Sequence, residues 1–180
     1  MEYAVVLLPL LGSIVSGFFG KQIGVYLSQI LTSSLVLISA VFSLIIFYKV
    51  LTQDYSNNIL IFNWISSGNF IVNWSIYIDS LTSVMLVVVS LISSIIHFYS
   101  IGYMSNDPHK SRFMAYLSLF TFSMLTLVTA DNFLQLFFGW EGVGLCSYLL
   151  IGFWYKKSTA NKAAIKAFVV NRVGDFGFAI

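Results

Sequence analysis

Glu141 is the residue whose surroundings most strongly suggest chemistry. It lies near the middle of an apolar run, residues 131–155, that reads DNFLQLFFGWEGVGLCSYLLIGFWY. A charged side chain at the centre of a bilayer costs a few kcal/mol, about 2.5–3.5 on the mildest insertion scale. Such a residue marks a proton or ion site, or one half of a buried pair. Gly139, Gly142 and Gly144 leave room beside it for a neighbouring helix or for water.

Four more charged residues occupy the last apolar stretch of the chain. Arg172 and Asp175 are three positions apart, so a helix places them on one face, where they can pair. Two readings of this pair are equally consistent with the spacing. The two charges only neutralise each other, or the pair forms one stage of a proton path. Lys162 is best explained by snorkelling to the membrane surface. Lys166 lies one turn deeper, and both readings stay open for it.

His97 lies inside another apolar stretch, after Ser90, Ser93 and Ser94. Histidine titrates near physiological pH, and hydroxyl groups with water can carry protons, so His97 is a candidate proton-transfer group. The alternative is that it only hydrogen-bonds to a neighbouring helix.

These residues need membrane helices to position them. Of the 180 residues 58% are hydrophobic and only 9% are charged, whereas soluble domains carry about 25% charged residues. The sequence therefore predicts an all-α polytopic membrane protein that forms a single domain over residues 1–180. The expected transmembrane helices, six in number, cover about 3–20, 25–50, 79–104, 112–130, 132–155 and 161–180.

The long connection between the second and third helices has a pattern of its own. Apolar and polar residues alternate over 72–79, a shorter run precedes them at 59–65, and Ser-Ser-Gly-Asn lies between the two runs. This pattern predicts a β-hairpin at about 59–78. An aromatic-rich interfacial loop is the alternative.

The lysines and arginines are distributed unequally between the two ends of the helices. Counting from the N-terminal side, the connections on that side hold one base, Lys49, with acidic residues that include Asp54. Those on the other side hold seven bases. The positive-inside rule then places the N-terminus and the hairpin outside. Glu141, ten residues from Asp131, would lie about 15 Å deep, near the midplane. Asp79 and Asp131 begin helices, where we expect them to cap the chain.

Several classes of function are excluded. The chain has no basic patch typical of nucleic-acid binding, no metal-ligand set and no nucleophile triad. The string GWEGVG follows no strand and lies in a membrane helix, so it is not a nucleotide-binding loop. Cys146 is the only cysteine and can form no intrachain disulfide.

Several runs resemble a known family. DNFLQLFFGWEGVGLCSYLLIGFW, NKAAIKAFVVNRVGDFGFAI, HFYSIGYMSNDPHKSRFMAYLSLFTFSMLTLVTADN and IYIDSLTSVML are similar to NADH:quinone oxidoreductase (respiratory complex I) chain L, also called NADH dehydrogenase subunit 5. The resemblance implies an antiporter-like membrane-arm subunit that couples NADH oxidation and quinone reduction to proton pumping. It implies that Glu141 and Asp175, with Arg172 beside them, belong to the proton channel, and that His97 stands where the family often has a histidine.

The resemblance also implies what lies elsewhere. NADH, FMN, iron–sulfur clusters and quinone belong to other subunits, and no redox centre, cofactor or metal is expected in this chain. The expected partners are other membrane-arm subunits, especially the adjacent antiporter-like subunit, and the lipid bilayer. The expected location is a bacterial inner membrane, with the mitochondrial inner membrane as the alternative.

Family members are several times longer than this chain, so we expect a truncated form with part of one antiporter-like repeat. The family's partner lysine would lie on a seventh helix, beyond Ile180. Two other functions stay open. One is a subunit of a multisubunit cation/proton antiporter or membrane-bound hydrogenase. The other is a membrane fragment without activity.

Overall fold

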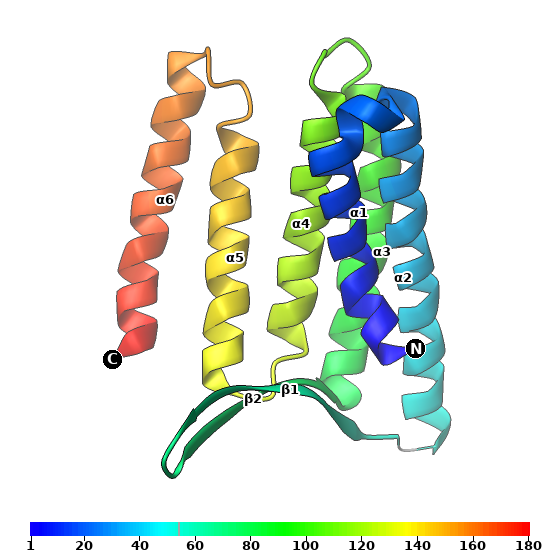
Figure 1. Cartoon of the computed structure of the whole chain (residues 1–180), viewed down its shortest axis with the longest axis vertical. Helices are drawn as coiled ribbons and strands as arrows, with labels where there is room; N and C mark the ends of the chain where they lie inside the picture. Colours follow the sequence, from blue (N-terminus) through cyan, green and yellow to red (C-terminus); the bar gives the residue numbers. More distant parts are fainter. Residues whose placement is uncertain (54) are drawn as a thin grey trace.

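The chain folds into helices and one β-hairpin. The computed structural model describes residues 1–53 and 55–180; Asp54, counted above among the outward charges, lies outside them. The described residues confirm the predicted class, a mostly helical protein with a hairpin between its second and third helices (Figure 1). The elements are α1 (Glu2–Ile23), α2 (Val25–Gln53), β1 (Asn57–Ser67), β2 (Phe70–Ile78), α3 (Ser80–Tyr103), α4 (Lys110–Val128), α5 (Phe133–Ile151) and α6 (Ser158–Ala179).

Five helices, α1 to α5, are long and apolar enough to cross a membrane, within the part of the chain that the structure describes. The sixth, α6, has a comparable length of 22 residues. It is less apolar because it carries Lys162, Lys166, Arg172 and Asp175. The charge on α6 is therefore the feature that separates it from its neighbours.

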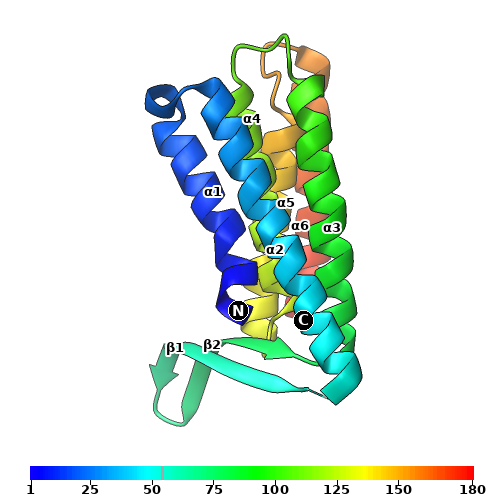
Figure 2. The ribbon, with the colours of Figure 1, turned by 90° about the vertical axis from the view of Figure 1, so that its right-hand side faces the viewer.

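Four of the helices form a group, and the other two extend that group to one side (Figure 1). Helices α1 to α4 pack together, α5 packs on α4, and α6 packs on α5 at the edge of the molecule (Figures 1 and 2). The N-terminus and the hairpin lie at the same end of the bundle, as the alternation of the helices requires (Figure 1). The connections after α3 and α5, with Lys110 at the start of α4 and Lys156 and Lys157 after α5, lie at the opposite end.

The hairpin is antiparallel and longer than its sequence pattern suggested. Its strands pair from Asn57 with Ile78 to Ser67 with Phe70. Gly68 lies in the turn with a φ of +57°, a conformation that glycine adopts without strain. Three aromatic side chains of the hairpin, Phe62, Trp64 and Trp74, cluster, and the two tryptophans contact Phe138 of α5 at 6.0 and 4.9 Å between ring centroids.

Gln135 of α5 fixes the hairpin to the bundle. Its side chain is 1% exposed and bonds to the backbone of Ser75 in both directions. The Ser75 N–H donates to Oε1 at 3.1 Å, and Nε2 donates to the Ser75 carbonyl at 2.7 Å. The Tyr77 N–H also donates to the carbonyl of Thr129, at 3.0 Å. The backbone N–H and C=O groups of β2 that face the bundle therefore have hydrogen-bond partners within the chain.

The two predicted helix caps have different outcomes. Asp79 caps α3, because its Oδ1 accepts a hydrogen bond from the Thr82 N–H at 2.7 Å. The prediction for Asp131 is wrong. Asn132 caps α5 by accepting from the Gln135 N–H at 2.9 Å, since it stands at the required three-residue spacing. Asp131 instead accepts from the Ser75 hydroxyl at 3.1 Å.

Helix α5 ends at Ile151 and not at Tyr155. The N–H of Gly152 bonds to the carbonyl of Tyr148, at 2.9 Å, which closes the last turn. Phe153 then turns back and packs edge-on against Phe113 of α4, with ring centroids 5.2 Å apart. The apolar composition continues past Gly152, which is why the hydropathy pattern placed the end too late.

Gln135→Leu is expected to destabilise the protein by about 2–4 kcal/mol, because it leaves two buried backbone groups of Ser75 without partners. Thermal unfolding in detergent measures the effect. Gln53→Leu makes the same change at an exposed position of α2 and serves as the control. Equal melting temperatures for the two variants would contradict this role of Gln135.

Candidate functional site

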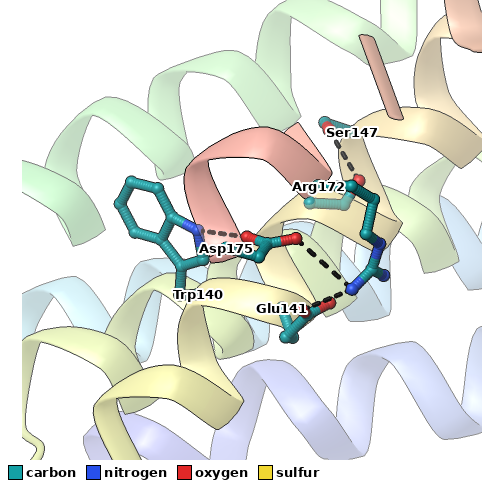
Figure 3. A network of polar contacts seen from close by, with 6 residues as sticks. Trp140, Glu141, Ser147, Arg172 and Asp175 are labelled. Atoms are coloured by element: carbon teal, nitrogen blue, oxygen red, sulfur yellow. Dashed lines mark hydrogen bonds and ion pairs between the residues drawn. The ribbon is translucent and has the colours of Figure 1, made fainter. Parts of the chain in front are cut away.

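Three ionisable side chains meet where α5 and α6 face each other, at mid-length of α5 (Figure 3). Arg172 of α6 forms an ion pair with Glu141 of α5 through Nη1 and Oε1. The same Nη1 lies 3.3 Å from Oδ2 of Asp175, one turn along α6. The guanidinium of Arg172 is thus shared between two carboxylates on two helices.

Trp140 completes the cluster from α5. Its indole N–H donates to Oδ1 of Asp175 at 2.9 Å. The guanidinium of Arg172 lies 4.6 Å from the ring centroid of Phe168, which adds a cation–π contact. Two contacts therefore cross between the helices in opposite senses: a cation of α6 reaches a carboxylate of α5, and a donor of α5 reaches a carboxylate of α6 (Figure 3).

The two carboxylates differ in their surroundings. The side chain of Asp175 is 10% exposed and both its oxygens have partners. The side chain of Glu141 is 25% exposed. Among the described residues, its Oε2 has no hydrogen-bond partner. Glu141 is therefore the more exposed carboxylate and the one with an oxygen that has no partner among the described residues.

The cluster holds more acidic than basic groups. With both carboxylates ionised, Arg172, Glu141 and Asp175 sum to −1. Arg172 can therefore compensate only one of the two negative charges at a time, and the contact with Glu141 is the one that crosses between the helices.

Glycines bring the helices into contact around the cluster. A Cβ on Gly139 would lie 2.7 Å from the Leu127 backbone of α4, and one on Gly142 would lie 2.8 Å from the Ser123 hydroxyl. On the other side, a Cβ on Gly144 would lie 3.1 Å from the amide of Asn171 on α6. The room that the sequence suggested beside Glu141 is thus occupied by the neighbouring helices.

The other two candidates lie apart from the cluster. Lys166 is exposed, and none of the ion pairs among the described residues includes it. His97 is fully buried on α3, with Nδ1 2.7 Å from the Ser93 carbonyl and Nε2 3.1 Å from the Ser118 hydroxyl of α4. These bonds join two helices and, in the described part of the chain, do not reach Glu141. The roles predicted for His97 and Lys166 in proton transfer stay predictions.

Sequence reasoning missed Trp140. The sequence did hold a sign of its role. An indole N–H inside a membrane helix needs a hydrogen-bond acceptor, and the neighbouring helix offers few acceptor side chains. Residues 1–53 and 55–180 contain no group of three or more His, Cys, Asp or Glu side chains that could hold a metal ion. The expectation that the chain binds no cofactor stays a prediction.

Two family models match the chain. One, described as "NADH-Ubiquinone oxidoreductase (complex I), chain 5 N-terminus", matches residues 64–114. The other, "NADH:quinone oxidoreductase/Mrp antiporter, TM", matches residues 130–180, the segment that holds the charged cluster.

Similar proteins come from bacteria and plants. NADH-quinone oxidoreductase subunit L of Rickettsia bellii is 56% identical over 176 residues, which are 98% of this chain and 27% of that protein. NADH-ubiquinone oxidoreductase chain 5 of Arabidopsis thaliana is 58% identical over 180 residues, which are 100% of this chain and 27% of that protein. The chain thus spans about a quarter of the length of these relatives.

A solved structure shares the fold. A chain of the membrane-bound sulfane sulfur reductase, described as an archaeal respiratory membrane complex, superposes with a TM-score of 0.80 at 18% identity. The match covers 97% of this chain and 35% of the other. The arrangement of helices described above is therefore one that a respiratory membrane complex uses.

Gly139→Ala is expected to destabilise the protein by about 1–3 kcal/mol, because the new methyl group would overlap backbone atoms that cannot move independently of α4. Gly102→Ala is the matched control, since no atom lies within 4 Å of the Cβ it would add. Thermal unfolding of both variants in detergent tests the packing. A Gly139→Ala variant as stable as the control would show that α4 and α5 are not in close contact there.

Proposed function

Because the chain belongs to the family of NADH-quinone oxidoreductase subunit L and NADH-ubiquinone oxidoreductase chain 5, we propose that it acts in proton translocation by a membrane-bound NADH:quinone oxidoreductase. The observation that carries this proposal is the cluster of Glu141, Arg172 and Asp175 at mid-length of a membrane helix. It lies within the segment that the antiporter family model matches.

In the proposed mechanism, Glu141 is the residue that takes up and gives up the proton. While Arg172 stays in contact, its charge compensates the ionised carboxylate of Glu141. When Arg172 moves away, an uncompensated carboxylate at this depth becomes costly, so Glu141 takes up a proton. When the contact forms again, the proton is released. Asp175 holds Arg172 on the α6 side and, with Trp140, fixes the distance over which it moves.

The driving force comes from outside these residues. We propose that oxidation of NADH and reduction of quinone take place in other subunits, which hold the FMN and iron–sulfur clusters, and that motion of membrane-arm partners displaces α6 relative to α5. The adjacent antiporter-like subunit is the proposed direct neighbour. The protein is a membrane protein, and we propose the bacterial inner membrane or the mitochondrial inner membrane as its site. His97 and Lys166 are proposed to lie on the route by which protons approach.

A second candidate is a subunit of a multisubunit cation/proton antiporter. The description of the family model that matches residues 130–180 includes Mrp antiporters, and this favours it. Transport that depends on NADH supports the first function, and transport that depends on a sodium gradient without NADH supports the second.

Glu141→Gln is expected to lower proton translocation about tenfold or more, because it keeps the shape of the side chain and removes its titrating group. The measurement is NADH-driven proton uptake by vesicles that contain the assembled complex. Glu2→Gln makes the same change near the membrane surface, where Glu2 accepts from the Tyr55 hydroxyl, and is the control. Unchanged pumping and quinone reduction in Glu141→Gln would show that Glu141 is not the proton site.

Arg172→Gln is expected to destabilise the protein by about 1–3 kcal/mol, since it leaves two neighbouring carboxylates without their shared cation. Asp175→Asn should restore part of that loss in the double variant, because it removes one of the two like charges. Unfolding of the two single variants and the double variant in detergent gives the coupling energy. Additive effects would contradict the shared role of Arg172.

A further inference from the structure

A second polar site lies at the lysine-rich end of the bundle. A cavity of about 410 Å³ opens between the first turn of α4, the last turn of α5, the connection after α5 and the first turns of α6. One part of its lining is polar and the other part is apolar. The polar part includes Arg112, Tyr116, Tyr148 and Asn161, and the apolar part includes Leu149 and Ile165.

Arg112 is the charged residue of this cavity, and its hydrogen-bonding capacity is largely unused. Its Nε is buried and has no hydrogen-bond partner among the described residues. Its Nη2 reaches only the carbonyl of Phe153, at 3.5 Å. The guanidinium lies 4.9 Å from the ring centroid of Phe153 and 5.7 Å from that of Tyr155, so aromatic faces hold it in place. None of the ion pairs in the described part of the chain includes Arg112.

The nearest carboxylate, Asp107, is held by other donors. Its Oδ1 accepts from the His109 N–H at 2.8 Å, and its Oδ2 accepts from the Trp154 indole at 3.0 Å. The hydrogen bond from His109 lowers the pKa of Asp107, so its carboxyl group is ionised at neutral pH. One oxygen is thus bonded within the connection before α4 and the other by the connection after α5. Arg112 acts on Asp107 through its charge, but the two form no ion pair, so the guanidinium N–H groups can still donate to another anion.

The surroundings of the cavity favour an anion that also carries hydrocarbon. Lys156, Lys157 and Lys162 are exposed at the same end of the bundle and raise the local positive charge. The apolar part of the lining, which includes Leu149 and Ile165, suits an acyl chain. Basic pockets between transmembrane helices on the positively charged side are typical sites for anionic lipid headgroups, and a planar guanidinium matches phosphate oxygens.

We propose that this cavity binds the phosphate of an anionic phospholipid, with Arg112 as the principal contact. Tyr116, Tyr148 and Asn161 line the same cavity and are further donors for the phosphate, although one N–H of the Asn161 amide already donates to the Tyr155 carbonyl at 2.7 Å. One bound lipid would then join α4 to α6 through the headgroup. The site lies at the end of the bundle away from the hairpin and is independent of the function proposed for Glu141.

The test compares lipids on the protein purified in detergent with the subunits that accompany it. Native mass spectrometry counts the molecules retained when phosphatidylglycerol and phosphatidylcholine compete at equal concentration. The wild type is expected to retain the anionic lipid about tenfold more, and Arg112→Gln is expected to lose this preference. Arg112→Lys keeps the charge without the fork, so an intermediate preference is expected. Lys21→Gln removes one charge from the same end, outside the cavity, and should behave as the wild type does.

Equal retention of the two lipids by the wild type would overturn the proposal, as would an equal loss in Arg112→Gln and Lys21→Gln. A further arm separates a lipid from a free anion. Inorganic phosphate at the same concentration should leave phosphatidylglycerol bound, and displacement of the lipid by phosphate alone would assign the cavity to the free ion. If Arg112→Lys kept the full preference for phosphatidylglycerol, a single positive charge would be sufficient. That result would refute the bidentate contact between the guanidinium and the phosphate.

Discussion

Hydrocarbon offers no hydrogen bonds, so the polar groups of the membrane-crossing helices have to find partners within the protein. This constraint explains where the side chains of the bundle lie. Ser43 of α2 and Ser90 of α3 bond to each other at 2.7 Å, and His97 of α3 meets Ser118 of α4. Many of the buried polar side chains are serines and threonines, which also return a bond to their own helix backbone. The polar residues thus mark many of the contacts between helices, beside a core cluster of apolar residues that includes Ile46, Leu86 and Leu125, while many other large apolar residues face outward.

The same constraint explains why the fold was largely predictable. A span of about 20 apolar residues has few alternatives to a helix, and period-two alternation over residues 72–79 has few alternatives to a strand. The helix ends were less predictable, because they depend on single residues. Gly152 stops α5 inside an apolar run, and Asn132 rather than its acidic neighbour caps the same helix. Tertiary contacts accompany both outcomes, since Phe153 after the helix end packs on Phe113 and Asp131 beside the cap accepts from Ser75.

Part of the candidate site was also visible in the sequence. The spacing of Arg172 and Asp175 predicted their contact, because that pair is local to one helix. The contact between Arg172 and Glu141 spans 31 residues and depends on how α6 rotates against α5, which spacing alone does not determine. The indole of Trp140 signalled that it needs an acceptor, but that the acceptor is Asp175 depends on the same rotation. His97 was identified as unusual, but only the packing of α3 on α4 shows that its partner is a hydroxyl group.

In the function proposed here, the reciprocal contacts between α5 and α6 would make proton binding depend on how the two helices are packed. Arg172 and Asp175 move together because they lie on α6, and Trp140 and Glu141 move together because they lie on α5. A displacement of α6 therefore weakens the Arg172–Glu141 pair and the Trp140–Asp175 hydrogen bond at once. Both carboxylates then lose a stabilising partner in the same step, so a small shift between helices has a large electrostatic effect. A cluster within one helix would not respond in this way, because its members would move as one body.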